Sequence, residues 1–273
     1  MTETATAARP SSRFYTEPSR LQVGDLEVAY RRKGSGEPVV FLHGAGGTRM
    51  WLPFYERLSQ SVDLIAPEHP GFGDTEFPDW LDGFDDLVLH YRDFFDALEL
   101  DRVDLVGYSL GGWIAAELAI FYPERLKSLT LVTPAGLHVP EAPMVDLFGI
   151  PPEKIPELLF NGNFMEYLDF LPDPTSLDDI VQAFGEMGTF ARLTWSPRYD
   201  PKFEHRLPSV RVPTLVVGAE DDWLIPNVHA DRWAEILPNA RLERIAGTGH
   251  AAIMQEPDRS AEVVLGFIEG VKP

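Results

Sequence analysis

The sequence predicts an α/β protein with a mostly parallel, doubly wound sheet and a helical segment inserted late in the chain. Short apolar runs alternate with amphipathic segments, several runs are apolar throughout, and one long interval has no convincing strand. Such alternation favours parallel strands joined by right-handed crossovers. The length of 273 residues fits one large domain with an insertion better than two independent halves.

Seven apolar runs are expected to form strands. They are LEVAY (26–30), PVVFLHG (38–44), VDLIAPE (62–68), VDLVGYS (103–109), SLTLVTP (128–134), PTLVVGA (213–219) and ARLERIAG (240–247). Runs that are apolar on both faces suit strands covered by helices on both sides. Four segments between them repeat apolar residues at helical spacing, and we expect helices over 84–98, 110–121, 228–237 and 260–268.

The pattern divides the chain into three parts. Residues 1–20 are small and polar and contain Pro10 and Pro18, a composition typical of a flexible arm. Residues 21–134 and 211–273 carry the strands and form the expected core. Residues 135–210 are rich in aromatic side chains, have helical periodicity in places and are too long for a plain connection. We therefore expect them to form a helical cap.

Charge and composition exclude several classes of function. Lys and Arg number 23 against 43 Asp and Glu, a net charge of −20 that disfavours nucleic acid and membrane surfaces as partners. The absence of cysteine excludes disulfides, thiolate metal sites and thiol nucleophiles. No leader pattern or long apolar run occurs. We expect a cytoplasmic monomer or homodimer that acts on a small molecule.

The strongest chemical signal is the sequence Gly107-Tyr108-Ser109-Leu110-Gly111 between a predicted strand and a predicted helix. Glycines two residues before and after a serine permit a sharp turn that lifts the serine hydroxyl above the sheet. The turn also places Ser109 at a helix N-terminus, where developing negative charge is favoured. Ser109 is therefore the candidate nucleophile; the alternative interpretation is an ordinary helix-capping serine.

A serine nucleophile needs a base, and that base needs an orienting acid. His250 is the preferred base because it lies in a glycine-rich loop between the last strand and the last helix. Asp222 is the preferred acid because it begins the pattern D-x-L-x-P after a strand, and Asp221 is the alternative. The chain order Ser109, Asp222, His250 is typical of a catalytic triad on such a sheet.

The remaining histidines are weaker candidates for the base. His90, His205 and His229 are expected to be surface or packed residues, whereas His138 opens the cap and is a candidate for substrate contact.

Five motifs in order, FLHGAGG, APEHPGFGDT, GYSLG, DDWLIP and GTGH, resemble the α/β-hydrolase superfamily from about Leu21 to the end of the chain. The resemblance implies the α/β-hydrolase fold, with Ser109 as nucleophile, His250 as general base and acid, and Asp222 as orienting acid. It also implies that HGAGG is the oxyanion loop, with the backbone N–H groups of Ala45 and Leu110 as donors. His43 is then expected to pack in the loop.

One departure from the family pattern keeps Asp221 open as the acid. The family usually has glycine three residues before its acid, where this chain has Ala219 relative to Asp222. Gly218 stands three residues before Asp221.

The predicted reaction is hydrolysis of a small to medium, partly apolar carboxylic ester through an acyl-enzyme, without cofactor or metal. A serine at position 109, where some relatives have aspartate, argues against the haloalkane dehalogenase and epoxide hydrolase branches. The pair Glu68 and His69 is only a weak metal candidate because adjacent side chains point in different directions. The cap aromatics from which we expect substrate contacts are Phe148, Phe160, Phe164, Phe184 and Phe190.

Three alternatives remain open. GYSLGG and VTPAGL also resemble hydrolases that cleave C–C bonds of aromatic ring-cleavage products, in which Arg192 or Arg198 would bind the substrate anion. A cofactor-free perhydrolase uses the same groups. A non-catalytic receptor for a small ligand is the least favoured, because a receptor has no need of all three triad residues.

Overall fold

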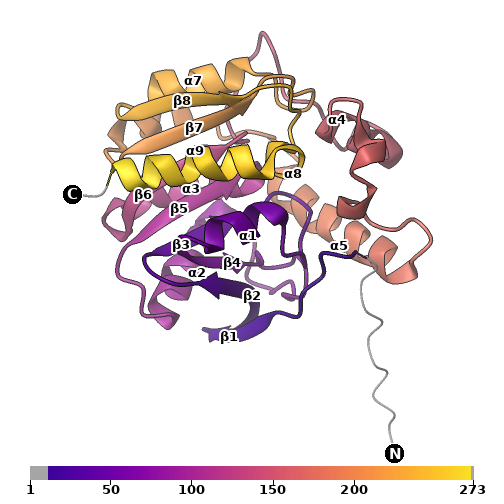
Figure 1. The fold of residues 1–273 in the computed structure, drawn as a ribbon, viewed down its shortest axis with the longest axis horizontal. Coiled ribbons are helices and arrows are strands. Elements are labelled where there is room, and N and C mark those ends of the chain that lie inside the picture. Colours follow the sequence, from indigo (N-terminus) through magenta and orange to yellow (C-terminus); the bar gives the residue numbers. More distant parts are fainter. Residues whose placement is uncertain (1–11, 272–273) are drawn as a thin grey trace, which may run out of the picture.

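The computed structural model describes residues 12–271, which form an open sheet with helices on both faces (Figure 1). The strands in this part of the chain are ordered β1-β2-β4-β3-β5-β6-β7-β8. They span β1 Ser19–Val23, β2 Leu26–Gly34, β3 Pro38–Leu42, β4 Asp63–Pro67, β5 Val103–Tyr108, β6 Leu126–Val132, β7 Thr214–Ala219 and β8 Ala240–Ile245. Pairing is antiparallel from β1 through β2 to β4 and parallel from β4 to β8. The predicted mostly parallel, doubly wound sheet is confirmed.

Each of the seven predicted apolar runs contains a strand. The central strand β5 is buried along its whole length, as its unbroken apolar character requires. The additional strand β1 lies at the sheet edge and is largely exposed, so it carries no such apolar signal.

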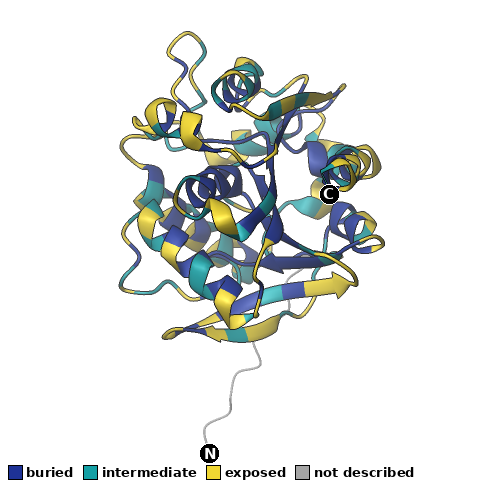
Figure 2. Ribbon diagram, turned by 90° about the vertical axis from the view of Figure 1, so that its left-hand side faces the viewer, coloured by how far each residue is buried: buried dark blue, intermediate teal, exposed yellow. Residues whose placement is uncertain are grey.

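Helices cover the two faces of the sheet in two groups, as the turned view shows (Figure 2). One group is α2 Phe84–Ala97, α3 Leu110–Phe121 and α7 Val228–Ile236; the other is α1 Pro53–Ser59, α8 Ala252–Gln255 and α9 Pro257–Gly270. Leu105 of β5 packs with the first group and Val106 with the second, because successive strand side chains point to opposite faces. Within residues 12–271, no helix has the length and apolar character needed to cross a lipid bilayer.

The described chain between β6 and β7 contains helices and turns but no strand. Its elements are η2 Pro152–Lys154, α4 Ile155–Leu159, η3 Phe164–Glu166, η4 Leu168–Phe170, α5 Leu177–Thr194, α6 Phe203–Arg206 and η5 Leu207–Ser209. α4 and α5 lie to the right of the sheet in Figure 1, apart from the helices that cover its faces. The C-terminal part of this inserted segment packs differently from α4 and α5, because Phe203 is fully buried against Trp113 and Trp233. Residues 203–210 therefore pack with the core, although the sequence pattern groups them with the cap.

The inserted segment is held to loops that follow the carboxyl ends of strands. On α5, the Thr189 hydroxyl donates to the Gly71 carbonyl and the Gln182 amide donates to the Gly73 carbonyl, each at 2.9 Å. At the end of α4, the Leu159 carbonyl accepts a hydrogen bond from the Ala251 N–H at 2.9 Å. The segment thereby contacts the loops after β4 and β8, at the edge where α/β sheets bind ligands.

Residues 12–20 are anchored to the fold, in contrast to the expected flexible arm, and residues 1–11 lie outside the described part. Tyr15 forms a β-bridge with Met50, and the Phe14 carbonyl accepts from the Trp51 N–H at 2.8 Å. The Phe14 ring stacks on Phe170 of the inserted segment with centroids 4.6 Å apart. This segment thus links the loop after β3 to the insertion.

Replacing Phe14 by alanine should lower the free energy of unfolding by about 1 kcal/mol, because the stacked contact with Phe170 is lost. Phe184→Ala is the matched control, since Phe184 is 82% exposed and should contribute little. Urea unfolding of both variants measures the difference. Equal stabilities of the two variants would contradict the anchoring of this segment.

Candidate active site

Ser109 occupies a strained turn between β5 and α3. Its backbone has φ 53°, a left-handed conformation that is uncommon for a residue with a side chain. The surroundings fix this conformation: the Ser109 N–H donates to the Val132 carbonyl at 3.0 Å, and its carbonyl accepts from Gly112 and Ala135 at 3.0 and 3.1 Å. The side chain stands half-buried at the N-terminus of α3.

The flanking glycines permit a very close approach of α3 to the sheet. A Cβ on Gly107 would lie 2.3 Å from the Gly111 carbonyl oxygen. A Cβ on Gly111 would lie 2.1 Å from the Leu42 carbonyl oxygen at the end of β3. Larger side chains at either position would push the first turn of α3 away from the strands and displace Ser109.

The structure brings Ser109, His250 and Asp222 into one chain of hydrogen bonds. The Ser109 Oγ lies 2.9 Å from His250 Nε2, and His250 Nδ1 lies 2.8 Å from Asp222 Oδ2. The side chains of His250 and Asp222 are only 1% and 2% exposed. Asp221 is exposed and is not in this chain; its backbone N–H donates to the Thr248 carbonyl.

The second oxygen of Asp222 is held by the backbone that follows it. Its Oδ1 accepts hydrogen bonds from the N–H groups of Leu224 and Ile225 at 2.9 and 2.8 Å. The backbone amides two and three residues after Asp222 thus point back toward its carboxylate, which restrains the carboxylate plane and leaves Oδ2 for His250.

The HGAGG loop, residues 43–47, lies beside Ser109. A Cβ on Gly44 would lie 3.4 Å from the Ser109 Cβ and 3.0 Å from the Tyr108 ring. Within residues 12–271, the N–H groups of Ala45 and Leu110 donate no hydrogen bond to another protein group. Ala45 and Ser109 are both partly exposed.

Two buried histidines, His43 and His69, form hydrogen bonds that hold the HGAGG loop in place. His43 Nε2 accepts from the His69 N–H at 2.9 Å, which leaves Nδ1–H to donate to the Gly44 carbonyl at 2.6 Å. His69 Nε2–H donates to the His43 carbonyl at 2.8 Å, and its Nδ1 accepts from the Tyr91 hydroxyl. Both rings therefore need their neutral forms. Burial lowers the pKa of His43 to about 4 and also lowers the pKa of His69.

A buried ionic network ties the same region to the sheet. Arg31 on β2 pairs with Glu68 at 2.5 Å, and Glu68 also accepts hydrogen bonds from the N–H groups of Arg49 and Asp74. The side chains of Arg31 and Glu68 are 4% and 3% exposed. Burial raises the pKa of Glu68, and the opposing effect of Arg31 is smaller. Neither residue stands out in the sequence, because a lone arginine and a lone glutamate are usually on the surface.

The other candidates occupy structural positions. His138 is exposed and packs edge-on against Tyr199, whereas His229 Nε2–H donates to the Ala142 carbonyl oxygen at 2.8 Å. The Arg192 guanidinium lies 4.9 Å from the Phe77 ring centre, and Arg198 pairs with Asp146 at 3.0 Å. Among residues 12–271, no group of three His, Asp or Glu side chains is arranged to hold a metal ion.

The predicted cap aromatics separate into packed and exposed residues. Phe160 is buried and stacks on Tyr167, and Phe190 is buried against Phe148. Phe164 is half-buried, whereas Phe184 points into solvent. Substrate contact by any of the five stays a prediction.

Comparison with known proteins identifies the family. The model of the Alpha/beta hydrolase family matches residues 39–263. The chain belongs to the alpha/beta hydrolase family. This result confirms the resemblance and the predicted fold, and the alpha/beta hydrolase sheet explains why residues distant in sequence meet at one edge.

Relatives of this alpha/beta hydrolase include enzymes named for two chemistries. It is 29% identical to 2-hydroxy-6-oxo-2,4-heptadienoate hydrolase of Pseudomonas putida, over 83% of this chain and 87% of that protein. It is 25% identical to monoacylglycerol lipase ABHD6 of Homo sapiens, over 88% of this chain and 77% of that protein. The meta-cleavage product hydrolase CumD of Pseudomonas fluorescens IP01 has a similar fold, with TM-score 0.79, 21% identity and coverage of 94% and 99% of the two chains.

The buried His43 should make stability depend on pH. Its folded pKa of about 4 lies below the ordinary 6.5, so its stabilising effect is complete above pH 6.5 and is lost as pH falls toward 4. His43→Gln should reduce the loss of unfolding free energy between pH 7 and 4.5. Burial also lowers the pKa of His90 to about 4. His90 should therefore preserve part of the dependence of unfolding free energy on pH in this variant.

Chemical unfolding at several pH values measures this effect, with His205→Gln as control because His205 is exposed. If the unfolding free energy of the His43 variant changed with pH as much as that of the unmodified protein, the lowered pKa of His43 would be contradicted.

Proposed function

We propose that this alpha/beta hydrolase is a serine esterase that cleaves small to medium, partly apolar carboxylic esters. The observation that carries the proposal is the hydrogen-bond chain from Ser109 Oγ through His250 to Asp222. A hydroxyl aligned on a neutral imidazole, whose other nitrogen is held by a carboxylate, is the arrangement that activates serine for acyl transfer.

The three groups divide the bond-making and proton-transfer roles of the reaction among them. His250 Nε2 takes the Ser109 proton as Oγ attacks the ester carbonyl, and the resulting imidazolium gives that proton to the leaving alcohol. Asp222 holds Nδ1–H and stabilises the imidazolium. His250 then deprotonates a water molecule that attacks the acyl-enzyme, and it gives that proton to Ser109 Oγ as the C–Oγ bond breaks and the acid is released.

The oxyanion formed in both steps would be stabilised by the N–H groups of Ala45 and Leu110. These groups flank Ser109, donate to no other described protein group, and one of them begins α3. Donors aimed at developing charge lower the barrier because they are already oriented when that charge appears.

C–C bond hydrolysis is the second candidate, because the Pseudomonas putida relative is named for a dienoate substrate. That reaction involves an anionic substrate and calls for a cationic side chain near Ser109. The two arginines considered for this role have other contacts: Arg192 lies over Phe77, and Arg198 pairs with Asp146. Ester hydrolysis needs no such cation and is therefore preferred.

Ser109→Ala should abolish ester turnover and leave thermal stability unchanged, because the half-buried hydroxyl contributes little to the core. The experiment compares p-nitrophenyl esters of two to twelve carbons with a ring-cleavage dienone. A serine-directed phosphonate should label the unmodified protein at Ser109 alone. Turnover of the dienone without ester turnover would favour C–C hydrolysis, and turnover by the alanine variant would exclude Ser109 as nucleophile.

Asp222→Asn should lower kcat by about 10³- to 10⁴-fold, because asparagine allows the wrong tautomer of His250. Asp221→Asn is the matched control: the neighbouring side chain is exposed and outside the hydrogen-bond chain, so kcat should be nearly unchanged. Steady-state kinetics of both variants on one ester shows which aspartate is the orienting acid. A larger loss in the Asp221 variant would move the acid to that position.

A further inference from the structure

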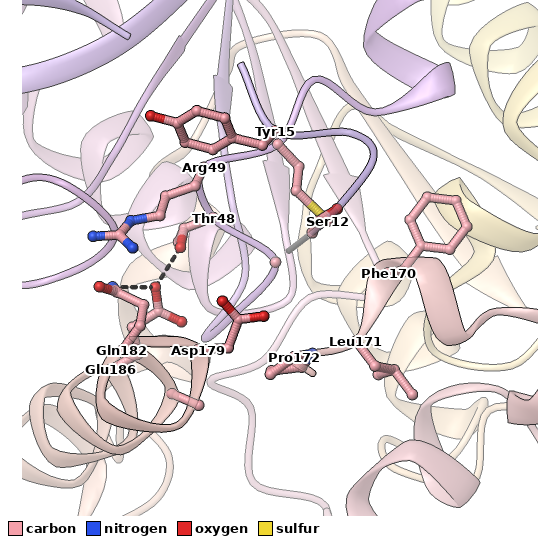
Figure 3. A pocket seen from close by; sticks show the side chains of 13 residues that line it. Ser12, Tyr15, Thr48, Arg49, Phe170, Leu171, Pro172, Asp179, Gln182 and Glu186 are labelled. Carbon is pink, nitrogen blue, oxygen red and sulfur yellow. Dashed lines mark hydrogen bonds between the residues drawn. The ribbon is translucent and has the colours of Figure 1, made fainter. Parts of the chain in front are cut away.

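A cavity between the insertion and the loop after β3 is lined by none of Ser109, Asp222 and His250. Its walls are loop residues 47–50, residues 170–172 and one side of α5, and Ser12 and Tyr15 close it from the N-terminal segment (Figure 3). The wall begins at Gly47, two residues after Ala45. Consecutive Cα atoms are about 3.8 Å apart, so Gly47 lies within about 8 Å of Ala45.

Glu186 of α5 is a buried acid of this cavity, with only 7% of the residue exposed. Its Oε1 accepts three hydrogen bonds, from the Thr48 hydroxyl, from the Gly73 N–H at 3.1 Å and from the Gln182 amide at 2.9 Å. Two of these bonds are drawn in Figure 3. All three donors meet the same oxygen, so Oε2 is left for another partner.

The free oxygen points toward the HGAGG loop. A Cβ on Gly46 would lie 3.9 Å from Glu186 Oε2, and Gly46 itself is exposed. Oε2 therefore borders open space next to the loop that we propose to bind the oxyanion. Burial raises the pKa of Glu186, while its hydrogen bonds and Arg49 act in the opposite direction.

Arg49 also lines this cavity. Its Nη2 pairs with Asp74 at 2.8 Å, whereas its buried Nε–H has no hydrogen-bond partner. The cavity thus combines a free acceptor on Glu186 with a second carboxyl group on Asp179, whereas the Arg49 Nε–H is buried. An anionic ligand group would meet two acids and a guanidinium already paired with Asp74. A neutral hydroxyl group can donate to Glu186 Oε2 and brings no negative charge next to these acids.

We propose that this cavity is a substrate subsite for a hydroxyl group, carried on the part of the ester that extends past the HGAGG loop, with Glu186 Oε2 as its acceptor. The proposal rests on ester hydrolysis at Ser109 and narrows the substrate class to hydroxylated esters. Specificity then comes from an acid on the insertion, and the apolar walls at Met50 and Phe170 accommodate the connecting carbon chain.

The kinetic test compares p-nitrophenyl 6-hydroxyhexanoate with p-nitrophenyl 6-methoxyhexanoate, because the methoxy group accepts a hydrogen bond but cannot donate one. The same comparison on the alcohol side uses 4-hydroxybutyl and 4-methoxybutyl acetate. The unmodified protein should prefer the hydroxyl compound in at least one pair by about tenfold in kcat/KM, the effect of one hydrogen bond to a charged group. This measurement needs no variant. Equal rates in both pairs would overturn the proposal.

Glu186→Gln tests the acceptor directly. The amide oxygen can replace Oε1 and retain the bonds from Thr48, Gly73 and Gln182, while an NH₂ group replaces Oε2 and can only donate. The hydroxyl preference should disappear or invert in favour of the methoxy ester. The control is Glu157→Gln, an acid of α4 paired with Lys154 at the surface, which should keep the preference. A preference unchanged by Glu186→Gln would overturn the role of Glu186.

A binding measurement separates this proposal from the proposed reaction. Ser109→Ala protein is titrated calorimetrically with 1,6-hexanediol and with 1,6-dimethoxyhexane, with and without Glu186→Gln. Stronger binding of the diol, lost with the glutamine, supports the subsite even if no ester is hydrolysed. Equal binding of the two compounds counts against the subsite even if esters are hydrolysed.

Discussion

The close approach of the first turn of α3 to the strand ends is the constraint on which the candidate site depends. A Cβ on Gly111 would collide with the Leu42 carbonyl, and a Cβ on Gly112 would lie 2.8 Å from Pro134. The ends of β3 and β5 and the residues just after β6 therefore all pack against the first turn of α3. This contact holds Ser109 in its unfavourable backbone conformation, points its hydroxyl out of the sheet and sets the Leu110 N–H beside it. Strain of this kind persists only where the surroundings over-determine it.

The loops around Ser109 are held by buried polar groups instead of apolar packing alone. Glu68 joins β2, through Arg31, to the backbone of residues 49 and 74, while the histidine pair joins the loops after β3 and β4. Buried polar groups of this kind are costly when one partner is missing and define a unique geometry when all are satisfied. The HGAGG loop has little side-chain bulk of its own, so its position depends on these partners.

The insertion acts on the site through the same loops. α5 contacts the segments after β3 and β4, and the end of α4 contacts the segment that carries His250. A change in the position of the insertion would therefore be transmitted both to the proposed oxyanion donors and to the proposed base. The N-terminal segment adds a third attachment, where Phe14 stacks on Phe170. The acidic groups of the cavity between the insertion and the loop after β3, Asp179 and Glu186, both belong to the insertion.

The sequence by itself determined the sheet class, its seven apolar strands and the positions of Ser109, Asp222 and His250 at strand ends. It could do so because strand and helix periodicity are local, and because a glycine-flanked serine has few other uses between a strand and a helix. The D-x-L-x-P pattern favoured Asp222 and left Asp221 open, and only the structure shows which of these adjacent side chains points to His250. Strand β1 was missed because it lies largely exposed at the sheet edge. The anchoring of residues 12–20 was missed because it depends on contacts of Phe14 and Tyr15 with residues distant in sequence. The burial of Arg31, Glu68 and Glu186 was decided by tertiary structure alone, because a charged residue is buried only where distant parts of the chain supply its partners.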